Sequence, residues 1–180
     1  MRVPPSKTHP NGYTTTRSAH CALNPSGKDH LIAGWTQYWN EVFNPKQPLD
    51  PNLVKALIAS ESSFNPSALA NKKNSNSARG LTQLTNETRK LLGSDSKELK
   101  DHFIDVTKKE LLDPSINICA GVRWLFRKKE IATGKLKREA TWDEAVYEFK
   151  GLDKADQKRR EELWNRFKTY LQEYQRCGKK

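Results

Sequence analysis

Apolar side chains recur along most of this chain at the three- and four-residue spacing of amphipathic helices. The first such run begins at Leu31 and stops before Pro45. A second run follows Asp50 and Pro51, an N-cap residue and the proline that suits the first helical position, and extends to Phe64. These signals predict two helices in the first third of the chain.

The middle of the chain predicts shorter elements. An Asn- and Ser-rich stretch over 71–77 is typical of a loop. We expect two short helices after it, over 78–84 and 85–92, the second closed by Gly93.

Three more helices are predicted in the second half. An Asp-Pro pair at 113–114 opens a helix that we expect to end at Gly134. Thr141 and Glu144 form a capping box, and the helix that they start is expected to end at Gly151. The last helix carries apolar residues on one face, and the pairs Trp35/Trp39 and Trp164/Phe167 are interpreted as core.

No alternating strand pattern and no internal repeat occurs, so the predicted fold class is all-α. Residues 1–29 hold four of the nine prolines and are predicted to form an irregular N-terminal arm. The length of 180 residues fits one domain over 30–180.

The composition adds a basic charge. Lys and Arg number 32 against 21 Asp and Glu, a net charge of +11, which favours anionic partners such as nucleic acid, acidic membranes or cell-wall polymers. We expect the basic clusters at 127–129, 135–138 and 158–160 to be solvated helix faces. No apolar run is long enough for a membrane span, and no apolar segment of a secretory signal follows Met1.

The cysteines and histidines do not indicate a catalytic or metal-binding site. Cys21, Cys119 and Cys177 are far apart and odd in number, which indicates neither a disulfide framework nor a zinc site. Cys119 is interpreted as a small buried residue. The four histidines match no ligand motif, so neither a metal nor another cofactor is expected.

Glu61 is the residue that points to chemistry. It follows Leu57 by four positions and Ile58 by three, which places a carboxylate on the apolar face near a helix end. Partial burial disfavours the ionised form, as a general acid near neutral pH requires. The alternative is a side chain that reaches the solvent from the last turn.

Four blocks in order extend this observation. They are ESSFNPSA at 61–68, ARGLTQLT at 78–85, DPSINICAG at 113–121 and AVY at 145–147. In order and residue type they resemble the soluble lytic transglycosylase family, over a motif-bearing core of about residues 50–152.

The resemblance implies a lysozyme-like helical fold around a sugar-binding cleft. It also implies cleavage of the β-1,4 bond between N-acetylmuramic acid and N-acetylglucosamine in peptidoglycan. Glu61 would act first as acid and then as base, taking the proton of the muramyl C6 hydroxyl while a 1,6-anhydro ring closes. Such a reaction needs no second carboxylate, unlike ordinary glycoside hydrolysis.

The same resemblance assigns the substrate-binding residues. Gln83 would line the cleft near Glu61, and Tyr147 would hydrogen-bond near Glu61 and orient it. Asn117 stands with them, although its motif position favours an architectural role. The family's substrate-contacting serine aligns with Asn74, and Ser75 or Ser77 could take its place, with Ser75 as the named candidate.

Three alternatives remain open from sequence. A hydrolytic muramidase would need a second carboxylate such as Glu148, Asp95 or Asp101. A non-catalytic wall-binding module would have no use for an acid on an apolar face. A nucleic-acid binder fits the charge, but basic residues are interleaved with acidic ones and no nucleic-acid module occurs.

The expected place of action is the periplasm or cell wall, with peptidoglycan glycan strands as partner. Because no classical signal peptide is found, we expect delivery by a phage particle or a dedicated secretion system. An antibacterial effector of this kind would have a cognate immunity protein as its second partner.

Overall fold

The computed structural model describes residues 27–177, and every regular element in that range is helical. The all-α prediction is confirmed. In chain order the elements are α1 (Asp29–Phe43), α2 (Pro51–Ser62), α3 (Asn86–Leu92), the 3-10 helix η2 (Glu110–Leu112), α4 (Pro114–Leu136), α5 (Trp142–Phe149), the 3-10 helix η3 (Leu152–Lys154) and α6 (Gln157–Cys177).

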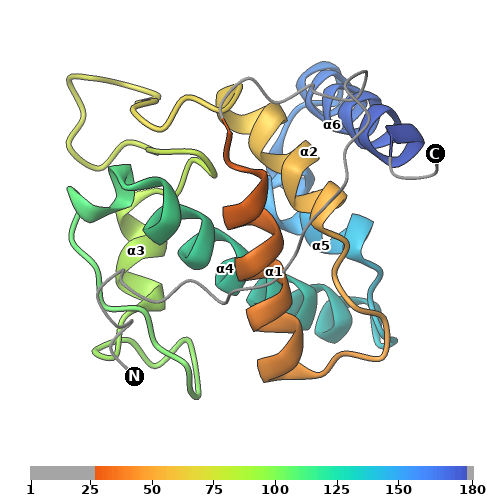
Figure 1. Ribbon diagram of the computed structural model, residues 1–180, viewed down its shortest axis with the longest axis horizontal. Helices are drawn as coiled ribbons and strands as arrows, with labels where there is room; N and C mark the ends of the chain where they lie inside the picture. The colour runs from red at the N-terminus through yellow and green to blue at the C-terminus, as the bar shows by residue number, and fades with distance from the viewer. Residues whose placement is uncertain (1–26, 178–180) are drawn as a thin grey trace.

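Helix α2 is the central helix, packed between α1 and α6 (Figure 1). All residues over 53–60 are buried, including Lys55, which is 4% exposed. The Lys55 ammonium pairs with Asp29 of α1 at 2.9 Å and lies over the ring of Tyr174 of α6. Since a buried charge is costly without partners, these contacts fix both neighbouring helices against α2.

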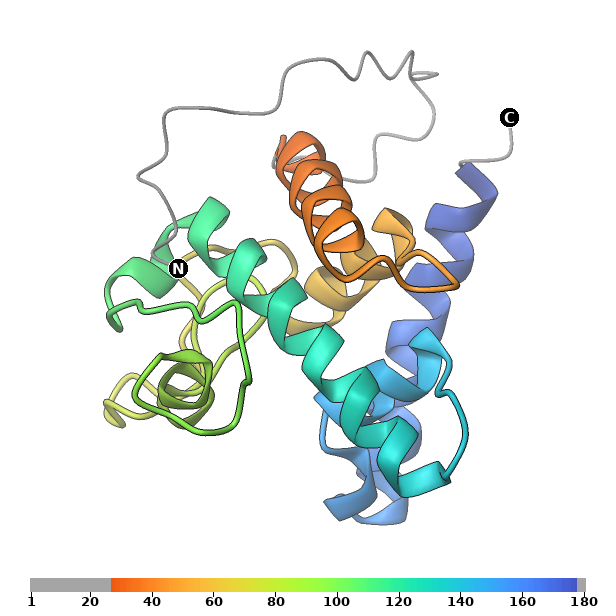
Figure 2. The same cartoon turned by 90° about the horizontal axis from the view of Figure 1, so that it is seen from below.

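Helix α4 divides the molecule. Figure 2 shows α3 and the loops of 63–112 on one side of it, and α5 with α6 on the other. Its start follows the predicted signal, because the Asp113 side chain accepts a hydrogen bond from the Ile116 N–H at 2.9 Å and Pro114 occupies the first turn.

The predicted helices form, with shifts at their ends. Helix α2 stops at Ser62 rather than Phe64, because Ser63 adopts a left-handed conformation and its N–H closes the helix on Ala59. Helix α4 passes through Gly134 and ends at Leu136, and α5 ends at Phe149, two residues before Gly151. Helix ends of this kind are set by tertiary contacts as much as by the local residue.

The prediction of a short helix over 78–84 is wrong. The segment forms turns, in which Gly80 and Gln83 both have positive φ angles, and Arg79 makes isolated antiparallel bridges with Leu69 and Leu84. Its polar backbone groups are satisfied by the rest of the fold rather than by a helix of their own. The loop predicted over 71–77 is confirmed.

The cysteines differ from the sequence prediction in one respect. Cys119 is free and buried as expected, and burial raises the pKa of its thiol to about 12. Cys177 is disulfide-bonded, whereas the sequence indicated no disulfide framework. The prediction failed because the number and spacing of cysteines do not show which of them the fold brings together. Of the predicted arm over 1–29, residues 1–26, including Cys21, lie outside the described residues, and Asp29 already belongs to α1.

The basic clusters are less free than predicted. Lys129 is 9% exposed and bonds Glu139 at 2.9 Å. Lys128 and Lys135 of α4 both pair with Glu148 of α5, at 3.6 and 2.7 Å. Part of the positive charge is therefore paired between α4 and α5, although the Lys135 side chain itself stays 53% exposed.

We predict opposite effects for two glycine-to-alanine changes in α4. A Cβ at Gly121 would lie 2.5–2.8 Å from Thr82 side-chain atoms, so Gly121→Ala should destabilise the protein by about 1–3 kcal/mol through overpacking. A Cβ at Gly134 meets nothing within 4 Å, so Gly134→Ala should stabilise it by about 0.5–1 kcal/mol. Chemical denaturation measures both, and equal effects would show that the contact with Thr82 is unimportant.

A second prediction concerns the start of α5. The Thr141 side chain accepts from the Glu144 N–H, and the Glu144 carboxylate accepts from the Thr141 N–H at 2.8 Å. Thr141→Ala should cost about 1 kcal/mol. Arg138 and the Thr141 N–H lower the Glu144 pKa to about 2 from an ordinary 4.5, so the stabilisation by this carboxylate is complete above pH 4.5 and is lost as the pH falls to about 2.

Thermal unfolding of Glu144→Gln against wild type checks the pH dependence. The difference in melting temperature should be largest near neutral pH and should vanish toward pH 2. Glu162→Gln, at an exposed position of α6, is the matched control and should show no such trend.

Candidate active site

Glu61 lies near the C-terminal end of α2, where the buried part of this helix ends. It directly follows the eight buried residues of 53–60, and its own side chain is 21% exposed. The partial burial expected of this residue is therefore found. Its carboxylate Oε1 accepts a hydrogen bond from the Lys150 ammonium at the end of α5.

Two cations from other helices meet this end of α2. The Lys150 side chain is only 2% exposed, and Arg166 of α6 donates from Nη2 to the Ser60 carbonyl at 2.7 Å. A helix C-terminus is the negative end of its dipole and disfavours a carboxylate. Because the last turn of α2 carries no basic residue of its own, Lys150 and Arg166 supply the compensating charge.

Burial lowers the pKa of the Lys150 amine below its ordinary value, and the Arg166 guanidinium acts in the same direction. Attraction to Glu61 opposes both effects. The charge of the buried Lys150 ammonium is therefore stabilised by the Glu61 carboxylate, and we treat the two groups as a buried ion pair.

Ser62 connects the end of α2 to the turn that carries Gln83. Its hydroxyl donates to the Leu81 carbonyl at 2.8 Å and, more weakly, to Ile58 of its own helix. The residue next to Glu61 is thereby tied to the turn over 80–83.

Asn117 of α4 fixes the same turn through hydrogen bonds from its side-chain amide. Its Oδ1 accepts from the N–H and the hydroxyl of Thr82, both at 2.8 Å. Its Nδ2 donates to the carbonyls of Leu111 and Arg79, at 2.8 and 3.2 Å. Gly80 is required here, since a Cβ would lie 2.2 Å from Asn117 Nδ2.

This geometry bears on the position of Asn117 among the candidate substrate-binding residues. The side chain is buried, at 1% exposure for the whole residue, and both ends of its amide are fully used. It has nothing left to offer a sugar, and its role in this structure is architectural.

Gln83 holds a left-handed conformation, with φ of 50°, at the end of the turn. Its Nε2 donates to the carbonyls of Gly80 and Ala68, at 2.8 and 3.2 Å. Both amide hydrogens are engaged in the fold, and within residues 27–177 no group donates to its Oε1. That carbonyl oxygen is the part able to accept a bond from a ligand hydroxyl.

Tyr147 lies on α5, one turn before Lys150. Its ring packs edge-on against Trp164 of α6, with centroids 5.6 Å apart. The expected hydrogen bond from Tyr147 to Glu61 is not found among the described residues; Lys150 engages the carboxylate instead. Three positions along a helix keep a side chain on the same face, so Lys150 can take the place expected for the tyrosine. Of the four aromatics interpreted as core, Trp39 and Phe167 are buried, and Trp35 and Trp164 are half-buried.

Ser75 is not brought to Glu61. It lies in the exposed loop, where its carbonyl accepts from Arg79 Nη2 at 2.7 Å and its hydroxyl from Lys108 at 3.5 Å. These contacts tie it to the segment before η2.

The carboxylates considered as partners for Glu61 are engaged elsewhere. Glu148 pairs with Lys128 and Lys135 of α4. The carboxylate of Asp101 is 66% exposed and lies 4.0 Å from His102. Asp95 belongs to a separate cavity.

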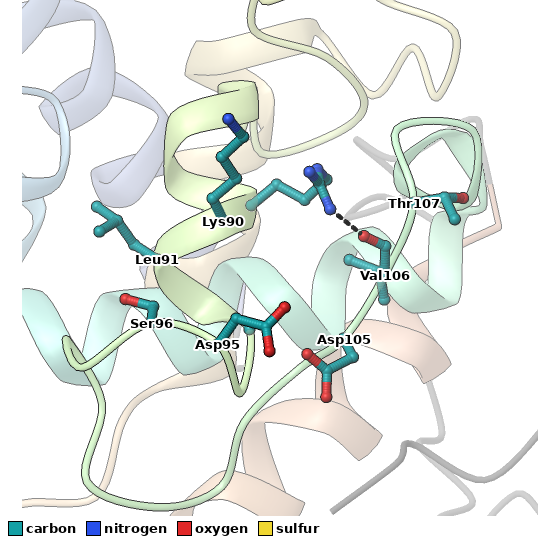
Figure 3. Close-up of a pocket in the computed structure, with 9 residues that line it drawn as sticks. Lys90, Leu91, Asp95, Ser96, Asp105, Val106 and Thr107 are labelled. Carbon is teal, nitrogen blue, oxygen red and sulfur yellow. Dashed lines mark hydrogen bonds between the residues drawn. The ribbon is translucent and has the colours of Figure 1, made fainter.

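That cavity, of about 650 Å³, lies between α3 and the segment over 105–107 (Figure 3). Asp95 and Asp105 border it (Figure 3), and Arg89, which also lines it, donates to the Val106 carbonyl at 2.7 Å. No residue of α2, α5 or α6 lines it. It is therefore distinct from the site around Glu61.

Sequence reasoning missed three residues of this site. Ser62 follows Glu61 directly in the first sequence block, but its position there did not predict a hydrogen bond to another segment. Lys150 is three positions after Tyr147, a helical spacing that could have indicated a shared face. Arg166 comes from a helix distant in the sequence, and no local pattern points to it.

Over the described residues, no cluster of three or more His, Cys, Asp or Glu side chains could hold a metal ion, and none of the helices is long and apolar enough to cross a membrane. Lys150 contacts the Glu61 carboxylate, Arg166 bonds the neighbouring Ser60 carbonyl, and the Gln83 amide belongs to the turn that Ser62 ties to the end of α2. This arrangement can exchange a proton with a bound substrate and accept hydrogen bonds from its hydroxyls.

Comparison with known proteins identifies the family. No curated protein matches the chain. The family model of the transglycosylase SLT domain matches residues 38–146, which is more than half of the 180 residues and includes Glu61, Gln83 and Asn117. Tyr147, Lys150 and Arg166 lie beyond the matched segment. The chain belongs to the transglycosylase SLT domain family.

Proposed function

We propose that this protein is a peptidoglycan lytic transglycosylase that cleaves the β-1,4 bond between N-acetylmuramic acid and N-acetylglucosamine and leaves 1,6-anhydro-muramic ends. The family match supports lytic transglycosylase-type activity on peptidoglycan. The observation that carries the finer proposal is the setting of Glu61, a partly exposed carboxylate that directly follows the buried stretch of α2.

In this proposal Glu61 serves twice. As an acid it gives its proton to the glycosidic oxygen while the bond from that oxygen to the muramyl C1 breaks. As a base it takes the proton of the muramyl C6 hydroxyl, whose oxygen forms the new bond to C1. The proton returns to Glu61, no water is consumed, and the anhydro ring is closed.

Two observations favour this reaction over hydrolysis. A hydrolase would pair Glu61 with a second carboxylate that activates water or attacks the sugar. The side chain that contacts Glu61 is instead the cation Lys150, and Glu148 is held by lysines of α4. We assign substrate contacts to the Gln83 carbonyl oxygen and to Tyr147; Ser75 would require a movement of its loop.

The substrate sets the place of action as the periplasm or cell wall. We further propose that the protein is delivered there by a phage particle or a secretion system, and that an antibacterial effector of this kind is neutralised by a cognate immunity protein. The net charge of +11 supports association with an anionic wall.

Digestion of purified peptidoglycan sacculi tests the reaction. Wild type should release anhydro-muropeptides, and Glu61→Gln, which keeps the shape but has no transferable proton, should be slower by at least about 100-fold. Mass spectrometry distinguishes the products, because reducing ends are heavier by one water.

Glu148→Gln is the matched control, since it makes the same replacement of a carboxylate by an amide at a glutamate of α5. It should keep most of the activity and the same products. Reducing-end products that disappear in Glu148→Gln would instead establish a two-carboxylate hydrolase. Thermal unfolding of each variant verifies that it is folded.

The biological role has a separate test. Wild type directed to the periplasm of a Gram-negative host should lyse the cells, whereas Glu61→Gln expressed at the same level should not. Survival of cells that carry active wild-type enzyme in the periplasm would contradict the effector proposal and leave the enzymatic one intact.

A further inference from the structure

We propose that Arg166 binds the carboxylate-bearing substituent of the muramyl sugar, so that its guanidinium selects muramyl residues over N-acetylglucosamine next to Glu61. The inference rests on the proposed function, because it takes the muramyl sugar to be bound at Glu61. It adds a residue that lies beyond the segment matched by the family model.

The packing of α6 along α2 determines where Arg166 lies (Figure 1). The Lys55 ammonium of α2 is 4.8 Å from the ring centroid of Tyr174 in α6. Arg166, about two turns earlier in α6, bonds the carbonyl of Ser60, which comes later in α2 than Lys55. The two helices therefore run antiparallel, and Arg166 lies at the end of α2 that carries Glu61.

The guanidinium of Arg166 has free donors. Arg166 is exposed, and over the part of the chain that the structure describes its one hydrogen bond runs from Nη2 to the Ser60 carbonyl, at 2.7 Å. Lys168 is paired with Asp143, whereas no Asp or Glu of residues 27–177 forms an ion pair with Arg166. Because Nη2 carries two hydrogens, one two-donor edge of the guanidinium stays free whichever of them Ser60 accepts. Such an edge matches the two oxygens of a carboxylate.

The charge around this end of α2 favours an anionic ligand. The side chain in contact with Glu61 is the cation Lys150, and the Arg166 guanidinium is close enough to lower the pKa of the Lys150 amine. Two positive groups thus accompany one carboxyl group. An anion bound at Arg166 would relieve the repulsion between the two cations.

The proposed substrate carries such an anion close to the bond that is cleaved. A muramyl residue differs from N-acetylglucosamine by the lactyl ether on C3. That ether ends in a carboxylate or bears the peptide stem, which has carboxylates of its own. The same sugar supplies the C1 and C6 atoms that react beside Glu61 in the proposed function. A guanidinium at this end of α2 therefore meets the substituent that distinguishes the two sugars of the strand.

Binding to insoluble sacculi tests the assignment without cleavage. All proteins carry Glu61→Gln, and cosedimentation gives the dissociation constant for native sacculi and for sacculi whose carboxylates are converted to neutral methylamides. Sacculi whose amines are acetylated are the matched chemical control. Amidation should weaken binding and acetylation should not. Equal binding of native and amidated sacculi would overturn the proposal.

The variants assign the effect to Arg166. Arg166→Met should bind native sacculi about 10-fold more weakly, the loss expected for a charge-assisted hydrogen bond, and amidated sacculi as tightly as the parent protein. Arg166→Lys, which keeps the charge but loses the two-donor edge, should lie between them. A residue that only caps α2 would weaken binding to both kinds of sacculi alike, and that result would overturn the proposal.

Arg159→Met is the control for a general loss of positive charge. Arg159 is exposed on the same helix, seven positions before Arg166, and its replacement should leave the ratio between native and amidated sacculi unchanged. Equal losses in Arg159→Met and Arg166→Met would contradict a specific contact. Thermal unfolding verifies that each variant is folded.

Two further comparisons complete the test. Strands stripped of their stems by an amidase keep the lactyl carboxylate: persistence of the Arg166 dependence assigns that group, and its loss assigns a carboxylate of the stem. Wild-type protein with Glu61 intact is assayed separately for cleavage. Absence of cleavage together with Arg166-dependent binding would refute only the proposed function, whereas cleavage together with equal binding of native and amidated sacculi would refute only the role of Arg166.

Discussion

The buried amide of Asn117 is the contact on which the site depends. It takes part in four hydrogen bonds: it accepts two from Thr82 and donates one each to the Arg79 and Leu111 carbonyls. Within the turn over 80–83 the Gln83 N–H bonds the Gly80 carbonyl, whereas the Thr82 N–H and hydroxyl are buried and would cost free energy without the Asn117 oxygen as their acceptor. Asn117 thus holds an irregular segment against α4, and Ser62 couples that segment to the end of α2.

The close approach of α4 to this turn demands residues without bulk. Gly80 admits the Asn117 amide, and Gly121 admits the Thr82 side chain. At Gly121 the glycine serves a contact and not a bend, since it lies in the middle of a regular helix. At this position α4 gives up helix propensity for a close approach to the turn.

The sequence predicted what is local and repeated. Helix starts at Asp50, Asp113 and Thr141 were readable because capping is decided within four residues. The position of Glu61 at the edge of an apolar face was readable for the same reason, from the period of a helix. The turn over 80–83 was not, because its bonds run to Asn117, 35 positions away.

The partners of Glu61 show the same limit. A motif gave Tyr147 as the neighbour, whereas the geometry of α5 presents Lys150, and α6 adds Arg166 from over one hundred positions away. Charge compensation depends on where helices pack, and packing is a property of the whole chain. The sequence held the residues but not the distances between them.

The docking of α6 on α2 has a consequence for biosynthesis. Arg166, Trp164 and the Tyr174 ring that covers Lys55 all belong to this last helix. While the ribosome is still synthesising residues 157–177, a nascent chain already holds Glu61 and Lys150 but lacks Arg166, which bonds the Ser60 carbonyl beside Glu61. The surroundings of Glu61 are therefore completed late in translation, and incomplete chains carry this carboxylate without them.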